Sequence, residues 1–137
     1  MSVQDLAARL IAEEVRLGGA AGPPSAAGFR VCEKLRKPLA TYAGVAGFRS
    51  LLSRALGLAK AKEPWLAALQ VNADGSIRFP TQAESESGTN KAARGGAILV
   101  TTLLELLVTF IGEALTLRLV SEVWPKAAVK DSKSGGK

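Results

Sequence analysis

The stretch Gly95–Pro125, GGAILVTTLLELLVTFIGEALTLRLVSEVWP, decides the fold of this 137-residue chain. Its unbroken apolar character predicts one helix from Gly96 to Trp124, which would be about 43 Å long. Apolar side chains occupy about 200° of the circumference of this helix, whereas a surface helix usually buries an arc of about 100°. The sequence therefore predicts a long C-terminal helix that needs neighbours on at least two sides.

Three kinds of neighbour could cover this helix. Shorter helices of the same chain could bury it, or a second copy or another protein could complete the cover. A lipid bilayer is disfavoured, because Ile98–Val120 contains Glu105, Glu113 and Arg118. Each of these charges costs about 2.5 to 3.5 kcal/mol at the centre of a bilayer. We expect membrane insertion to be the weakest of the three alternatives.

The preferred function is that of a non-enzymatic interaction or scaffold module. Its long apolar C-terminal helix would bind a second copy of the chain or a partner protein. The residues expected to form this interface are Leu103, Leu106, Phe110 and Leu117.

A polar stripe on the same helix carries the one pair of carboxylates in an apolar setting, Glu105 and Glu113. If this stripe lined a closed cleft, one of the two carboxylates could act as a general acid or base. The simpler interpretation is that the stripe faces solvent, where glutamate and threonine are ordinary. A small enzyme that uses these two glutamates therefore stays an alternative function, and we expect no enzymatic activity.

The preceding segments predict three shorter amphipathic helices. The first extends from a cap at Ser2 to Gly18, and the second begins at a cap at Ser25 and kinks or restarts at Pro38. The third covers about Val45–Ala61, where apolar residues recur at helical spacing. These helices predict a mainly α fold, a small bundle of about four helices.

A β-hairpin is expected between the third helix and the last. Leu69–Asn72 and Ser76–Phe79 alternate apolar and polar residues on either side of Asp74-Gly75. Asp-Gly favours the primed two-residue turn that joins antiparallel strands.

Two remaining segments are expected to lie outside regular secondary structure. Residues 80–94 are polar and small without a helical period, which predicts a mobile loop. Residues 125–137 are expected to form a disordered basic tail, so that residues 1–124 make up a single helical domain.

Composition excludes several kinds of chemistry. The chain has no histidine and one cysteine, so histidine catalysis, histidine metal sites and a disulfide within one chain are all ruled out. We expect no metal and no cofactor. The N-terminus lacks the pattern of a secretory signal, so we expect a reducing cytoplasm, and the Ala, Leu, Gly and Arg bias suggests a bacterial source.

The positive net charge suggests a second alternative function, that of a basic regulatory domain that binds nucleic acid. Arg30, Lys34 and Lys37 share one helical face and are candidates for binding an anion. Half of the net charge of +6 lies in residues 126–137, however, and no motif known to read nucleic acid occurs. Nucleic acid is therefore a less favoured partner than protein.

Two further residue types have competing interpretations. Cys32 lies near positive charges that could activate a thiol, but it shares a face with Phe29 and Leu35, which favours a buried structural thiol. Trp65 and Trp124 each adjoin a proline, and either could anchor an interface or close the edge of a core.

Overall fold

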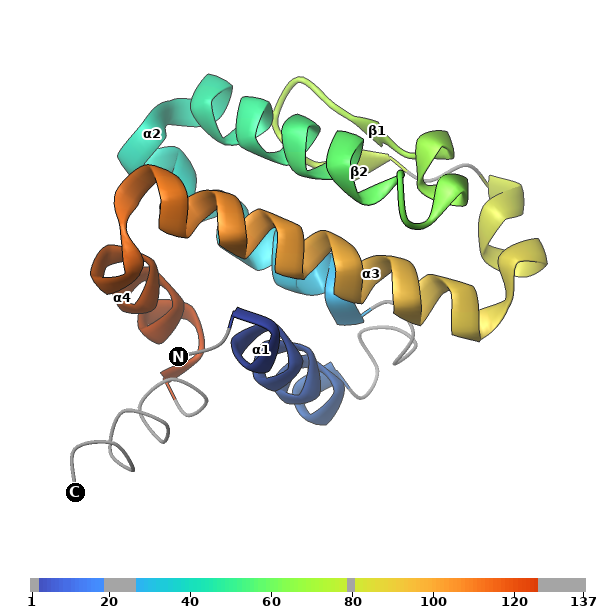
Figure 1. Ribbon diagram of the computed structural model, residues 1–137, viewed down its shortest axis with the longest axis horizontal. Helices are drawn as coiled ribbons and strands as arrows, with labels where there is room; N and C mark the ends of the chain where they lie inside the picture. Colours follow the sequence, from blue (N-terminus) through green and yellow to red (C-terminus); the bar gives the residue numbers. More distant parts are fainter. Residues whose placement is uncertain (1–2, 19–26, 79–80, 126–137) are drawn as a thin grey trace.

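The protein is a bundle of helices with one small β-hairpin, as the sequence predicts (Figure 1). The computed structural model describes residues 3–18, 27–78 and 81–125, and it places the side chains of these ranges except for 81–92. The elements are α1 Val3–Gly18, α2 Ala27–Ala59, the 3-10 helix η3 Pro64–Ala68, β1 Gln70–Val71, β2 Ile77–Arg78, α3 Thr81–Ile111 and α4 Glu113–Val123. The predicted caps at Ser2 and Ser25 and the predicted tail at 126–137 lie outside the described residues.

The second element is a helical hairpin whose turn lies at Gly44. Gly44 has φ 82° and ψ 160°, and the two arms of α2 on either side of it are residues 27–43 and 45–59. Helical structure continues through Pro38, so of the two predicted outcomes, a kink or a restart, the restart was wrong. Gly44 makes the turn because its φ and ψ belong to a region that almost no residue other than glycine adopts.

The C-terminal apolar stretch forms two helices, so the prediction of one continuous helix from Gly96 to Trp124 was wrong. Helix α3 ends at Ile111, Gly112 has φ 90° and ψ 160°, and α4 begins at Glu113. This is the backbone conformation found at Gly44. Helix α4 folds back beside the body of the bundle in Figure 1, where a continuous helix would have projected beyond it.

Helix α3 also begins earlier than expected. It starts at Thr81, so the prediction of a mobile loop over 80–94 was wrong for the residues from 81 onward. Residues 81–94 lack an apolar period, but they include three alanines, two glutamates, a glutamine, a lysine and an arginine, which have high intrinsic helix propensity.

The hydrophobic core surrounds α3, which passes between α1 and the second arm of α2 in Figure 1. Its fully buried leucines contact residues of α1, of both arms of α2 and of α4 within one cluster. The largest side chains of this core are Trp124, Phe48, Leu10, Leu35, Leu39, Leu52, Leu66, Leu99, Leu103, Leu104, Leu107 and Leu119. The chain itself therefore covers most of the apolar surface of α3.

Glycines allow α2 and α3 to cross closely. A Cβ atom on Gly28 would lie 2.6 Å from the carbonyl carbon of Gly96, and a Cβ atom on Gly95 would lie 2.7 Å from the ring of Trp65. Trp65 is half-buried and makes an edge-to-face contact with Phe29, with ring centroids 6.3 Å apart. Trp65 and Trp124 thus both pack against the core.

The hairpin is present with the predicted strands, in the register Gln70↔Arg78 and Val71↔Ile77. Its turn differs from the predicted primed turn, because Gly75 has a positive φ of 91° and Asp74 does not. The Gly75 amide donates to the Asn72 carbonyl at 3.0 Å, and Asp74 Oδ1 accepts from the Ser76 amide at 3.0 Å. The result is a three-residue loop in which only one residue needs positive φ.

Candidate functional site

A buried carboxylate, Glu14 in α1, is the most unusual polar group among the described residues, with 1 % of its surface exposed. One of its oxygens, Oε2, lies 2.6 Å from Lys34 Nζ and accepts a 2.8 Å hydrogen bond from Trp124 Nε1. The other, Oε1, lies 3.5 Å from Arg30 Nε. These four residues, which we call the Glu14 cluster, join α1, the first arm of α2 and the end of α4.

The Glu14 cluster changes the interpretation of two predicted anion-binding residues. Arg30 and Lys34 both pair with Glu14, so one of their two positive charges is neutralised within the fold and both side chains are already engaged. The sequence contained a signal for this carboxylate, because Glu14 continues the stripe formed by Leu6, Ala7 and Leu10 at helical spacing. The sequence alone does not identify Glu14 as a site residue, because acidic residues are rarely buried without a partner and its partners lie on other helices.

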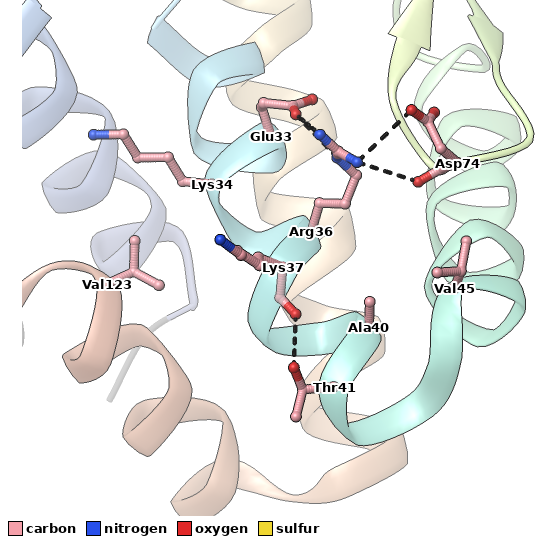
Figure 2. Close-up of a pocket in the computed structure, with 9 residues that line it drawn as sticks. All are labelled: Glu33, Lys34, Arg36, Lys37, Ala40, Thr41, Val45, Asp74 and Val123. Atoms are coloured by element: carbon pink, nitrogen blue, oxygen red, sulfur yellow. Dashed lines mark hydrogen bonds and ion pairs between the residues drawn. The ribbon is translucent and has the colours of Figure 1, made fainter.

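A pocket of about 680 Å³ lies between the first arm of α2, the end of α4 and the hairpin (Figure 2). Arg36 projects across it and pairs with Glu33, with its Nε donating at 2.9 Å, and with Asp74, whose Oδ2 lies 3.8 Å from Nη1. The hydrogen bond to Glu33 is the main cause that raises the pKa of Arg36, and hydrogen bonds from Ser76 lower the pKa of Asp74. Arg36 pairs with two carboxylates, so these three residues give this part of the pocket wall a net formal charge of −1.

The three predicted anion-binding residues are not brought together as a set. Figure 2 shows Lys34 directed away from Arg36 toward α1, while Lys37 lies on the pocket wall with its carbonyl accepting a 3.1 Å hydrogen bond from Thr41 Oγ1. Within the described part of the chain no ion pair is found for Lys37. One unpaired surface lysine is too little to define an anion site.

The two glutamates of the alternative catalytic hypothesis are separated by the break at Gly112. Glu105 lies in α3 and Glu113 begins α4, and both side chains are exposed. Neither lines the pocket of about 680 Å³ or a second one of about 390 Å³. Among the described residues, no group of three or more acidic or cysteine side chains is placed to hold a metal ion.

The four predicted interface residues differ in exposure. Leu103 is fully buried in the core, so the expectation that it lies on a surface was wrong: α1 and α2 cover that side of α3. Leu106 and Leu117 are half-buried and pack against the core. Phe110 is 68 % exposed and remains available for contact with another molecule.

Two other exposed apolar residues, Tyr42 and Val45, flank the Gly44 turn. The Gly44 turn and the turn between α3 and α4 lie at the same end of the bundle in both figures. We call the end of the bundle that carries these two turns, with the exposed residues Tyr42, Val45 and Phe110, the apolar end. No sequence pattern predicts that Tyr42 and Val45 are exposed, because their exposure follows from the position of the turn at Gly44.

Cys32 is a buried thiol in the first arm of α2, with 1 % exposure. Burial, with a smaller contribution from the charge of Glu33, raises the pKa of this thiol to about 12. It therefore stays protonated and unreactive, as the sequence predicted for a structural cysteine.

One helix of the described chain is long and apolar enough to cross a membrane, judged by length and composition. This segment is Ala93–Ile111, with a mean hydropathy of 1.7, and 44 % of it is buried inside the protein. Core helices of bundles have the same properties. Comparison with models of known protein families, with curated proteins and with solved structures gave no match.

Proposed function

We propose that the protein is a non-enzymatic helical interaction module that associates with a second copy of itself through the apolar end. The observation that carries this proposal is the exposure of Phe110, a large apolar side chain in the last turn of α3. An exposed large apolar side chain is a candidate for contact with another molecule, and Tyr42 and Val45 are exposed at the same end of the bundle (Figure 1). Aromatic residues are also enriched at the energetic centres of protein interfaces.

The charge distribution favours a second copy as the partner. Residues 39–48 and 106–112, which contain the two turns and the apolar end, carry no charged side chain, whereas the whole chain has a net charge of +6. Two copies can therefore meet at this end without placing like charges against each other. A symmetric contact uses the same patch on both subunits, so a neutral apolar patch suits it well.

Replacement of Phe110 by glutamate tests this proposal. A carboxylate at this position would have to lose its water in the contact between two copies, so we expect the average mass measured by light scattering to fall to that of one chain. The far-ultraviolet circular dichroism spectrum should be unchanged, because Phe110 is mostly exposed.

Leu58→Glu is the matched control, since Leu58 is 48 % exposed and lies toward the other end of the second arm of α2. Residues 45 and 58 are separated by about 20 Å along that arm. We expect the Leu58 variant to keep the mass of the unaltered protein. A single-chain mass for the unaltered protein across the micromolar range would overturn the proposal.

A further inference from the structure

We propose that two copies exchange α4: the helix straightens at Gly112, and α4 of each copy packs in the position that α4 of the other has left. This proposal rests on the proposed self-association and specifies its geometry. The occupant of the site is thus the α4 helix of a second copy of this chain. Three features of the structure support it.

The first feature is a hinge of one residue. Gly112 is the only residue between α3 and α4, and its φ of 90° with ψ of 160° lies in a region that is essentially restricted to glycine. No atom outside its immediate neighbours lies within 4 Å of the position of a Cβ on Gly112. A change of this residue to helical φ and ψ would join α3 and α4 into one helix, and short hinges under strain favour exchange between subunits.

The second feature is the orientation of the two buried faces. In a continuous helix with 100° per residue, the buried face of α4 would lie about 180° from that of α3 around the common axis. The residues that define these faces are Leu99, Val100, Leu103, Leu104 and Leu107 in α3, and Thr116, Leu119 and Val120 in α4. A straightened α4 therefore points its apolar face away from its own bundle, and a second copy can cover it.

The third feature is that α4 is held by contacts that another copy can supply unchanged. Leu119 and Val120 insert in the core, and Trp124 Nε1 donates to Glu14 Oε2 at 2.8 Å. In the exchanged dimer the same contacts form between chains. Phe110 lies two residues before the hinge, so it would lie where the two straightened helices leave their bundles and approach each other.

Gly112→Ala provides the test, because alanine disfavours the bent conformation and favours the helical one. We expect the dissociation constant of the dimer, measured by size exclusion with light scattering over a dilution series, to fall at least tenfold. Gly44→Ala is the matched control. This substitution places the same backbone strain at the turn of α2. Straightening that turn would open the core around the buried Phe48, so we expect a lower free energy of unfolding and no increase in dimer.

The location of α4 in the dimer can be measured directly. Dimers refolded from an equal mixture of 13C,15N-labelled and unlabelled chains should show nuclear Overhauser effects between the Trp124 indole and Glu14 of different chains. Absence of such signals in a population that is dimeric by mass would overturn the exchange. It would leave the proposed contact through the apolar end intact, since that contact is tested separately by Phe110→Glu.

A lengthened hinge covers the case in which Gly112→Ala does not fold. Insertion of Gly-Ser-Gly after Gly112 lets α4 fold back without strain, so we expect the dimer fraction to fall at least fivefold. An unchanged dimer fraction in this variant would contradict the exchange. A protein that is monomeric in all variants would contradict both the exchange and the proposed function.

Discussion

Glu14 shows how one residue can connect three helices. Its carboxylate is 1 % exposed and balanced by Lys34, Arg30 and the Trp124 indole. Removing one member of a buried polar cluster leaves the others without partners, which is costly. We expect Glu14→Ala to lower the free energy of unfolding by about 2 to 4 kcal/mol. The lower end of this range applies because Lys34 is partly exposed, so water can hydrate its charge when the carboxylate is removed.

Urea denaturation monitored by circular dichroism measures this change. Glu105→Gln is the control: Glu105 is exposed on α3, so its substitution should change stability by less than about 0.5 kcal/mol. Equal stability losses in the two variants would show that the Glu14 cluster does not hold the helices together.

Cys32 provides a prediction for pH dependence. Its thiol has a pKa of about 12 in the folded protein against 9.0 for an ordinary thiol. Between these values the unfolded chain releases a proton that the folded chain retains, so the folded state loses relative stability as pH rises above about 9. Below pH 9 both states hold the proton and the effect is absent.

We therefore expect the free energy of unfolding of the unaltered protein to fall more steeply between pH 9 and 10.5 than that of Cys32→Ala. The difference in slope should approach about 1.4 kcal/mol per pH unit. Parallel pH profiles would contradict a buried, protonated thiol. Thiol titration with a chromogenic disulfide at pH 8 should also be slow in the folded protein and fast in urea.

At the scale of elements, close contact between α2 and α3 depends on Gly28 and Gly96. A Cβ on Gly28 would lie 2.6 Å from backbone atoms of Gly96, which cannot rotate away. We expect Gly28→Ala to lower the free energy of unfolding by about 1 to 3 kcal/mol through overpacking. Gly57→Ala is the control with the opposite sign, because Gly57 is helical with open space around it, and alanine should raise stability by about 0.4 to 1 kcal/mol. Thermal denaturation of both variants measures the two effects.

The elements also show what the sequence can predict. The helices at Val3–Gly18 and at 45–59 and the hairpin were predictable, because apolar spacing and Asp-Gly are local signals. The breaks at Gly44 and Gly112 were not, since glycine inside an apolar helical pattern is compatible with continuation as well as with a turn. The Glu14 cluster was visible as a glutamate on an apolar stripe, but its partners come from two other helices.

At the scale of the whole molecule, the break at Gly112 turns the buried face of α4 back toward the core. Plotted on one continuous helix, the apolar residues of α3 alone span about 200°, and the buried residues of α4 fall on the opposite, polar side. Folded back at Gly112, each helix turns an ordinary face to the core. The excess that led us to expect a partner is thus largely satisfied inside the chain, and what remains exposed is the apolar end with Phe110.

Association through that end should make stability depend on protein concentration. A dimer that forms only from folded chains draws the folding equilibrium toward the native state, and the effect grows with the ratio of concentration to dissociation constant. We expect the thermal midpoint of the unaltered protein to rise by several degrees between about 2 and 200 μM, because a stabilisation of 1 kcal/mol shifts the midpoint of a domain this size by about 4 °C. The midpoint of Phe110→Glu should stay constant over the same range. Since both proteins keep the same core, a concentration-dependent midpoint in the variant would place the contact somewhere other than the apolar end.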